Sequence, residues 1–270
     1  MPAIWICADD YGLSRGVSRG IRDLISLGRI NATSVMVLPS AFDTEEANAL
    51  KDLAPSAIGL HVTLTAPFKP LSPDFPHLDQ GRFCALSELL RRAIGRRLEI
   101  SAVSAEISAQ LDAFIAAFGR PPDFVDGHQH VQLFPQVRDA FLRVVAERTP
   151  NAWVRQCGRA GFARRLSSRK ALLLDLLSFA FRRKARRFGL HFNPAFAGAY
   201  EFTPDADFSK LFPTFLDGLP DAGLIMCHPG FVDAELQRLD PLTLLREREY
   251  AYFKSDQYAQ LLAGKAISLA

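Results

Sequence analysis

Short apolar runs rich in isoleucine, valine and phenylalanine alternate along the chain with segments whose apolar residues recur at helical spacing. This alternation is typical of βα units around a parallel sheet. The first run, residues 3–7, is almost wholly apolar and predicts a strand that is buried on both faces. Ser14 can cap the helix that follows, and Gly28 can end it. We therefore expect the chain to begin with one βα unit.

The same alternation continues to the carboxyl end of the chain. Further strands are expected at residues 33–38, 58–64, 124–126, 153–155, 224–227 and 266–269. Helices are expected at residues 44–53, 85–97 and 102–118, after Pro135, and over most of residues 242–262. About seven βα units without an internal repeat or a linker favour one domain over residues 1–270. The predicted fold class is α/β, as a distorted TIM-like (β/α) barrel with its site at the carboxyl ends of the strands.

The alternation is interrupted at residues 65–84, which carry prolines at positions 67, 70, 73 and 76. Proline removes a backbone donor and fixes φ, so this density of prolines disfavours regular structure. We expect a long loop that faces the substrate.

Composition and charge narrow the classes of protein. Hydrophobic residues make up 49% and charged residues 23% of the 270 residues, which excludes a disordered chain. A net charge of +3, without a basic run among aromatic residues, gives no indication of nucleic-acid binding. The four cysteines lie far apart, as is typical of reduced thiols. With no basic and apolar leader and no apolar run of spanning length, we expect a cytoplasmic protein without a membrane-spanning helix.

Two adjacent carboxylates, Asp9 and Asp10, come directly after the first apolar run, and Tyr11 and Gly12 then turn the chain. Neighbouring carboxylates repel each other and favour either a shared proton or a bound cation. One of them can therefore bind a metal while the other acts as a base. The structural alternative is a turn aspartate followed by an aspartate that caps a helix.

Histidines follow three of the other predicted strands. His61 lies in an apolar segment, His128 and His130 come directly after another strand, and His228 precedes a Pro-Gly turn. Each has a structural alternative, because a single buried histidine is usually a core residue or part of a turn. In an extended segment both His128 and His130 would reach one metal, whereas in a tight turn only one would.

These residues are stronger evidence for a metal site when they are considered together than when they are considered singly. Four strand ends present a pair of aspartates, a histidine, a His-Gln-His segment and another histidine. One carboxylate with two imidazoles leaves open positions on a metal for water and for a substrate oxygen, as a catalytic site requires. The sequence therefore predicts metal-dependent hydrolysis, in which His228 can protonate an amine leaving group.

Four segments resemble the YdjC-like carbohydrate deacetylases, a family that includes chito-oligosaccharide deacetylases. They are residues 8–14 (ADDYGLS), 59–65 (GLHVTLT), 126–135 (DGHQHVQLFP) and 226–233 (MCHPGFVD), in the family's order and spacing. The resemblance implies a distorted barrel that holds one divalent metal at Asp10, His61 and His128, with Asp9 as the general base. It places His130 beside the metal ligands rather than among them. The chain departs from the family at Gln129 and Gln132, where many members carry histidines.

The resemblance also suggests how the neighbouring residues act. The metal would polarise an acetamide carbonyl, Asp9 would take a proton from water, and His228 would protonate the departing amine. Asp126 would orient a histidine ligand through its second ring nitrogen, and Arg155 would hold Asp9 ionised. A surface position is the alternative for Arg155. Zinc or magnesium is expected, although ligands of this kind also accept manganese, cobalt and nickel.

The substrate depends on the loops around the site. Residues 83–90, 154–159, 196–200 and 230–242 resemble the branch of the family that is associated with hopanoid biosynthesis. This resemblance implies an N-acetylglucosamine unit attached to a hopanoid lipid. The alternatives are a chito-oligosaccharide or another amino sugar, a different amide or a phosphoester, and a non-catalytic sugar- or lipid-binding barrel. The last would predict loss of the base or of a ligand, yet Asp9, Asp10, His61 and His128 are all present.

A helix at residues 170–187 leaves two interpretations open. Its leucines are followed by a basic end, so it could rest on an anionic membrane at the inner face of the cell membrane. It could equally pack its leucines against the barrel and leave the basic end in solvent. A homodimer is expected only from the base rate for enzymes of this size.

Overall fold

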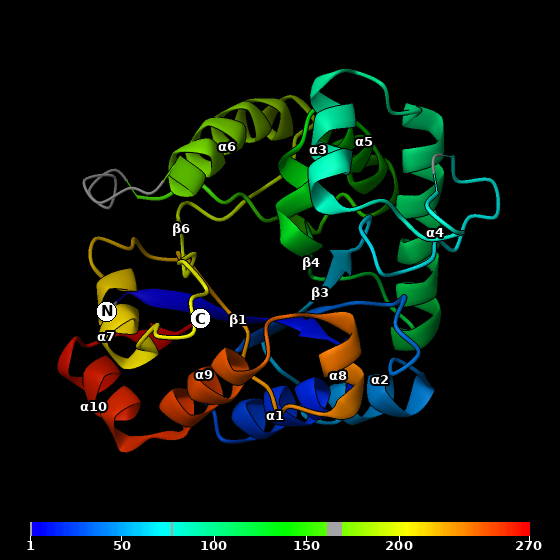
Figure 1. Ribbon diagram of the computed structural model, residues 1–270. Helices are drawn as coiled ribbons and strands as arrows, with labels where there is room; N and C mark the ends of the chain where they lie inside the picture. The colour runs from blue at the N-terminus through cyan, green and yellow to red at the C-terminus, as the bar shows by residue number, and fades with distance from the viewer. Residues whose placement is uncertain (1, 77, 161–168) are drawn as a thin grey trace.

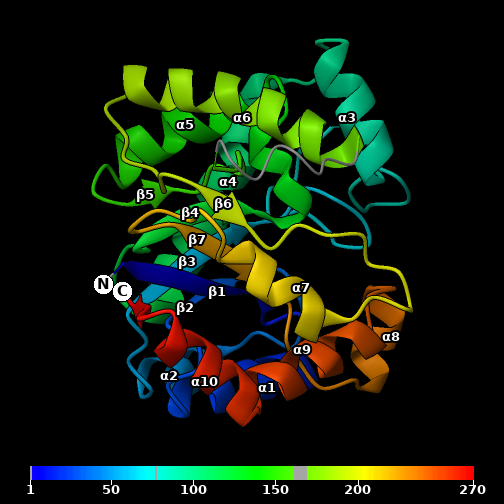
Figure 2. The ribbon, with the colours of Figure 1, turned by 90° about the vertical axis from the view of Figure 1, so that its left-hand side faces the viewer.

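The computed structural model describes residues 2–76, 78–160 and 169–270. Its centre is a curled parallel sheet with the strand order β5-β4-β3-β2-β1-β7-β6, and β8 pairs with the start of β1 (Figures 1 and 2). The strands are β1 (Ala3–Tyr11), β2 (Ala32–Val35), β3 (Ala57–Val62), β4 (Phe124–Gly127), β5 (Trp153–Val154), β6 (Phe196–Ala197), β7 (Leu224–Cys227) and β8 (Ser268–Leu269). The predicted α/β class is confirmed, as a parallel sheet that forms part of a barrel.

Helices cover both faces of this sheet. In Figure 1, α3, α5 and α6 lie above it and α4 runs down beside it, whereas α1, α2, α8, α9 and α10 lie below it. The helices are α1 (Arg15–Ser26), α2 (Thr44–Lys51), α3 (Leu86–Ile94), α4 (Ile100–Phe118), α5 (Val137–Arg148), α6 (Arg169–Arg187), α7 (Phe208–Phe215), α8 (Ala234–Leu239), α9 (Leu244–Lys254) and α10 (Asp256–Gly264). A short 3-10 turn, η1 (His128–Leu133), follows β4.

The first βα unit forms as its sequence predicts. The Ser14 hydroxyl accepts a hydrogen bond from the backbone N–H of Val17 at 3.2 Å, which satisfies a free donor at the start of α1. Gly28 follows the helix with a φ of 64°, a left-handed conformation that glycine adopts without strain. The stripe of α1 that contains Val17, Ile21 and Leu24 is fully buried.

The strand β1 is longer than its apolar run and includes Asp9 and Asp10. The expectation that both aspartates follow the strand was therefore wrong. β1 is central and pairs with β2 and β7 on either side, and Asp9 and Asp10 lie in the irregularity between the paired residues Ala8 and Tyr11. The two carboxylates are consequently fully buried rather than placed in a surface turn.

Some other elements differ from the sequence expectation. The helix predicted over most of residues 242–262 is divided into α9 and α10 by Ser255, whose hydroxyl accepts from the backbone N–H of Tyr258 at 3.3 Å. The elements β6, α7 and α8 were not expected. β6 has two residues and α8 has six, which is too short for a periodic pattern, and α7 contains Pro213.

The proline-rich segment contains no helix or strand in the part that the structure describes, and it is tied to α4. The carboxylate of Glu106 accepts from the backbone N–H groups of Leu71 at 3.2 Å and Ser72 at 2.8 Å. Gln110 donates to Glu106 at 2.8 Å and to the carbonyl of Thr63 at 2.7 Å, just beyond the end of β3. This network fixes the loop next to the strand that carries His61.

By length and composition alone, α4 is apolar enough to cross a membrane. In the structure it packs against α5, α2 and β3, and its buried side includes Val103, Leu111 and Phe114. The core helix of a globular domain has the same features.

Candidate metal-dependent active site

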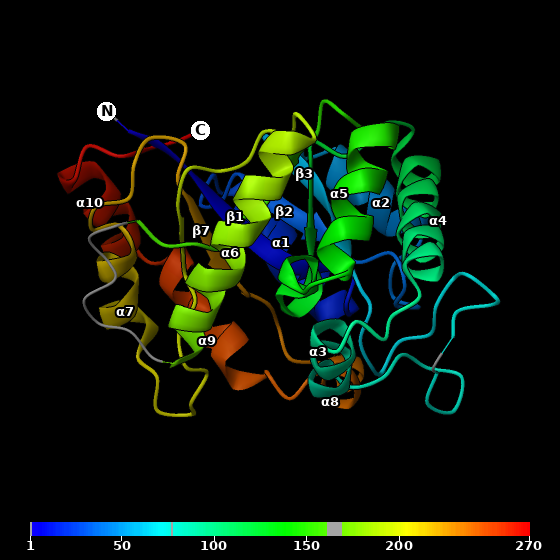
Figure 3. The same ribbon diagram turned by 90° about the horizontal axis from the view of Figure 1, so that it is seen from above.

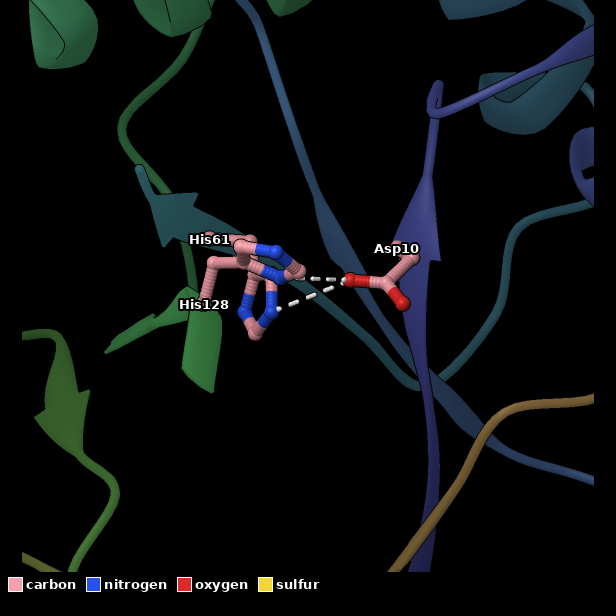
Figure 4. A group of neighbouring side chains, drawn as sticks. All are labelled: Asp10, His61 and His128. Carbon is pink, nitrogen blue, oxygen red and sulfur yellow. Dashed lines mark hydrogen bonds and ion pairs between the residues drawn. The ribbon is translucent and has the colours of Figure 1, made fainter. Parts of the chain in front are cut away.

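Three strands of the sheet, β1, β3 and β4, bring the predicted ligands together at their carboxyl ends. Asp10 lies near the end of β1, His61 near the end of β3, and His128 directly after β4 (Figure 4). The Asp10 Oδ1 atom lies 3.4 Å from His61 Nε2 and 3.1 Å from His128 Nδ1. One donor atom from each residue lies within 4.8 Å of the other two. The structure thus gathers one carboxylate and two imidazoles, the set that the sequence analysis singled out.

The backbone of Asp10 is left-handed, with a φ of 69°. Few residues other than glycine adopt this conformation, although aspartate and asparagine tolerate it better than most. Asp10 lies where the register between β1 and β2 shifts. A side chain at such a position departs from the alternation of an ordinary strand, and here its carboxylate meets His61 and His128.

His61 is held in one orientation by its other ring nitrogen. His61 and Asp126 are register partners on β3 and β4, and His61 Nδ1 lies 2.5 Å from Asp126 Oδ1. Because a carboxylate only accepts, Nδ1 carries a proton toward Asp126, and Nε2 is the ring nitrogen that faces Asp10. Ser34 on β2 donates to the same Asp126 oxygen at 2.5 Å. The sequence analysis expected Asp126 to orient a histidine, and the structure places it in contact with His61.

Arg155, which follows β5, contacts Asp9 through two parallel hydrogen bonds. Nη1 donates to Oδ2 and Nη2 to Oδ1, both at 2.6 Å, and both side chains are fully buried. Nη2 also lies 2.6 Å from Asp126 Oδ2. One guanidinium group therefore fixes both Asp9 and Asp126. The alternative that Arg155 is a surface residue is wrong.

A second buried arginine, Arg246 on α9, was not found from the sequence. Its Nη2 donates to Asp10 Oδ2 at 2.7 Å and to Asp240 Oδ2 at 2.8 Å. This contact occupies one oxygen of Asp10 and leaves the other facing the two histidines. Although burial raises the pKa of Asp10, Arg246 and His128 hold it well below its usual range.

The charges of the site favour a bound cation. Four carboxylates, those of Asp9, Asp10, Asp126 and Asp240, share the two guanidinium groups of Arg155 and Arg246. Burial lowers the pKa of His61, but Asp126 and Asp9 outweigh burial and raise it to about 10. Without another cation, a proton on His61 offsets part of the excess negative charge. A divalent metal can replace that proton, so the donor set and its charge fit such an ion.

His228, at the end of β7, lines the same cavity. Burial lowers its pKa to about 4, so its ring is neutral near pH 7. Its buried Nδ1 has no hydrogen-bond partner within the described residues, and its ring meets the ring of Phe202 edge to face at 5.4 Å. Its backbone N–H donates to Glu249 at 2.6 Å. His228 is thus placed beside the cluster but outside the group of donor atoms.

His130 does not join His128. Gln129 and His130 both have left-handed backbones, with φ values of 54° and 61°, so η1 is a tight turn rather than an extended segment. His130 Nδ1 lies 3.5 Å from the sulfur of Cys157, and its ring packs on that of Phe196. Of the two geometries left open by the sequence, the structure shows the one in which a single histidine reaches the cluster.

A cavity of about 440 Å³ opens onto these residues. Its polar wall includes Asp9, Asp10, His61, His128 and His228, together with Gln129, His130, Asp240, Thr243 and Arg246. Its remaining wall is mostly apolar and includes Leu86, Phe202, Pro204, Met226, Pro241, Leu242, Leu244 and Leu245. Phe68, from the proline-rich loop, packs its ring against His128 at 6.3 Å. A cavity of this size with a few polar groups at one end is typical of a small-molecule site.

Comparisons with known proteins identify relatives of the chain and a solved structure with the same fold. A relative from Citrobacter koseri named chitooligosaccharide deacetylase is 30% identical over 249 residues, which cover 91% of this chain and 84% of the relative. One of the same name from Salmonella paratyphi B is 28% identical over 245 residues, with the same coverage. A crystal structure from Enterococcus faecalis V583, of a candidate cellobiose-phosphate cleavage protein, shares the fold with a TM-score of 0.81. It is 22% identical, and the match covers 100% of this chain and 97% of that chain.

The family model described as YdjC-like protein matches residues 3–264. This match includes every residue of the cluster described above. The chain therefore belongs to the family of YdjC-like proteins.

Proposed function

We propose that this protein is a metal-dependent carbohydrate deacetylase, which hydrolyses the N-acetyl group of an amino sugar. The observation that carries the proposal is the convergence of Asp10, His61 and His128 beside Asp9 in a cavity of about 440 Å³. The relatives named chitooligosaccharide deacetylase support the same class of reaction.

In this proposal Asp10 Oδ1, His61 Nε2 and His128 Nδ1 hold one divalent metal, and zinc or magnesium is our first choice. When bound, such a metal supplies Lewis-acid chemistry, which polarises a carbonyl and makes water more acidic. Asp126 keeps His61 in the tautomer that can ligate, and Arg246 leaves Asp10 one free oxygen.

Asp9 acts as the general base in this scheme. Its two oxygens are fixed by Arg155, and Oδ2 lies 4.0 Å from His61 Nε2, so the carboxylate borders the proposed metal position. Asp9 takes a proton from water, whose oxygen bonds to the carbonyl carbon of the acetamide. The carbon–nitrogen bond then breaks, and the products are acetate and an amine. Because the His228 ring is neutral at rest, the proton that Asp9 removes is available to pass through His228 to the leaving amine.

For the substrate we propose an N-acetylglucosamine unit that is attached to a hopanoid lipid. Two observations support this choice: the resemblance of residues 83–90, 154–159, 196–200 and 230–242 to that branch of the family, and the apolar wall of the cavity. Leu244 at this wall has 63% of its surface exposed, so an apolar substituent on the sugar can contact it without a conformational change of the protein.

A chito-oligosaccharide is the second candidate, favoured by the names of the relatives. The same polar groups would act on either sugar. The two candidates differ in whether the leucines of the cavity wall contribute to binding.

The test is acetate release by the purified protein from an N-acetylglucosaminyl hopanoid and, separately, from chitobiose, with and without a chelator. We expect release from the hopanoid that a chelator abolishes and that added metal restores. Asp9→Asn should abolish release while the protein stays folded. Asp112→Asn is the matched control, because Asp112 is an exposed partner of Arg148 and its replacement should leave the rate unchanged.

Release from chitobiose alone would keep the chemistry and overturn the lipid-linked substrate. No release from either substrate after metal has been restored would overturn the deacetylase proposal.

A further inference from the structure

Helix α6 presents a stripe of large apolar side chains to solvent. Leu172, Leu176 and Phe179 are spaced at helical intervals, so they lie on one face, and they are 53%, 67% and 62% exposed. Leu173 beside them is 44% exposed. Single exposed leucines are common on protein surfaces, but four neighbouring large residues on one helix are unusual. The interpretation that the helix packs all its leucines against the barrel is therefore wrong.

The same face becomes cationic toward the carboxyl end of the helix. Arg183 and Arg187 continue the spacing of Leu176 and Phe179, and both are exposed. No ion pair joins Arg183, Arg186 or Arg187 to a carboxylate in the part of the chain that the structure describes. Lys184 faces the body of the protein instead, where it pairs with Asp139 at 2.5 Å. The outward face thus combines an apolar half with a half that carries positive charge. We call this face, made by Leu172, Leu173, Leu176, Phe179, Arg183 and Arg187, the α6 stripe.

The opposite face of α6 is firmly attached to the protein. Phe181 and Ala185 are fully buried, and the Ser178 hydroxyl accepts from the backbone N–H of Cys157 at 3.0 Å. Asp175, the only carboxylate of the helix, pairs with Arg159 at 2.8 Å. The helix therefore cannot turn its apolar half inward without breaking these contacts.

The position of α6 gives its surface access to a large flat partner. Figures 1 and 2 show α6 on the outside of the molecule above the sheet, at about the level of α3. In Figures 2 and 3, its amino-terminal end, which carries the apolar half, lies toward the side of the molecule at which β1 ends. The cavity opens at that same end of β1.

We propose that the α6 stripe docks on an anionic lipid bilayer. The leucines and Phe179 would enter the interface between head groups and acyl chains, while Arg183 and Arg187 would contact anionic head groups. Charge complementarity favours this occupant. A second copy that packed on the same stripe would bring arginines against arginines or against leucines, because a two-fold interface pairs a surface with itself.

The proposal concerns binding alone and does not rest on the deacetylase chemistry. It implies that the cavity is held close to the bilayer surface, where lipid-linked sugars lie.

The test is co-sedimentation of the full chain with vesicles of phosphatidylcholine, with and without phosphatidylglycerol. We expect binding only when phosphatidylglycerol is present. Leu176→Glu should weaken this binding about tenfold or more. The change removes one leucine from the interface and introduces a negative charge, which the anionic head groups repel. Leu27→Glu is the matched control, because Leu27 is an exposed leucine at the end of α1, outside the α6 stripe. The double change Arg183→Gln with Arg187→Gln should weaken the preference for the anionic lipid while it leaves the fold intact.

Equal partitioning to both vesicles, or equal binding by Leu176→Glu and Leu27→Glu, would overturn the proposal. So would a concentration-dependent dimer in sedimentation velocity that Leu176→Glu dissociates, since the stripe would then be a contact between copies of the chain. Acetate release from chitobiose is measured on both variants. Whatever its result, the binding data decide this proposal separately from the one on function.

Discussion

Arg246 and Asp10 are 236 positions apart in the sequence, yet a guanidinium N–H of one donates to a carboxylate oxygen of the other at 2.7 Å in the protein interior. The contact distinguishes the two oxygens of Asp10. Oδ2 is engaged with the arginine, whereas Oδ1 faces His61 and His128. A carboxylate constrained in this way would bind a cation through one oxygen rather than two.

We expect Arg246→Gln to destabilise the metal-free protein by about 3–5 kcal/mol, because it leaves the buried carboxylate of Asp10 and the half-buried one of Asp240 without their cation. Added zinc should restore part of this loss, since a divalent ion at Asp10 neutralises one of them. Urea unfolding with and without zinc measures both effects. Arg148→Gln, which removes an exposed ion pair, should cost at most about 1 kcal/mol and should not respond to zinc. Equal losses in the two variants would contradict this reading of Arg246.

Asp126→Asn should weaken metal binding about tenfold to a hundredfold, because an uncharged amide holds His61 Nδ1 less firmly than a carboxylate does. A competition titration against a coloured chelator gives the affinity without any measurement of turnover. Asp139→Asn is a suitable comparison, since Asp139 pairs with Lys184 on the outer helices, away from the cluster. An affinity that is unchanged in Asp126→Asn would mean that His61 is oriented by other contacts.

Glu249 gives the folded protein a defined dependence on pH. Burial raises its pKa from 4.5 to about 7, although the hydroxyl of Tyr200 and the backbone N–H of His228 donate to its carboxylate. Between these two values the folded protein retains a proton that the unfolded chain has lost, so stability falls as the pH rises. The contribution of protonated Glu249 to the free energy of unfolding is complete below pH 4.5 and is lost as the pH rises through about 7.

Glu249→Gln cannot titrate, so it should remove this part of the pH dependence. Urea unfolding of both proteins from pH 4 to pH 8 should show a stability difference that changes by roughly 3 kcal/mol across the window. Parallel curves would show that Glu249 titrates normally in the fold.

Glu106→Ala should release the proline-rich loop. The backbone N–H groups of Leu71 and Ser72 lose their acceptor. So does the buried side-chain amide of Gln110, and an unsatisfied buried donor costs about 1–3 kcal/mol. We expect faster cleavage near residues 70–76 in limited proteolysis followed by mass spectrometry. Glu99→Ala, just before the same helix, removes an exposed carboxylate and should leave the cleavage rate as it is.

Much of the sheet could be predicted because its strands are short apolar runs. Residues 58–64 and 224–227, for example, differ from β3 and β7 by no more than two positions at either end. The end of β1 was missed for a physical reason. Asp9 and Asp10 lie in an irregularity of the strand, between the paired residues Ala8 and Tyr11, and the pairing that continues β1 as far as Tyr11 is invisible in a local sequence pattern.

The residues of the candidate site likewise fall into two groups, those that the sequence predicts and those that it does not. Asp9, Asp10, His61 and His128 lie at or just after the ends of short apolar runs, so the sequence places them at one edge of the sheet. Arg246 and Glu249 lie instead in the run LLREREYAYFK, where charged residues follow one another on a helix. Nothing local distinguishes the buried Arg246 and Glu249 from their more exposed neighbours Glu247 and Arg248, because the direction in which α9 faces depends on the rest of the fold.

The left-handed backbone at Asp10 limits which residues can replace it during evolution. Glycine would adopt the same conformation with less strain, and asparagine would tolerate it about as well, but neither has a carboxylate. Glutamate has the carboxylate and is poorly suited to the backbone. The substitutions that this backbone conformation tolerates best therefore remove the negative charge that the two histidines face. A descendant in which the backbone strain at position 10 is relieved would keep the barrel, but it would lack the carboxylate that faces His61 and His128.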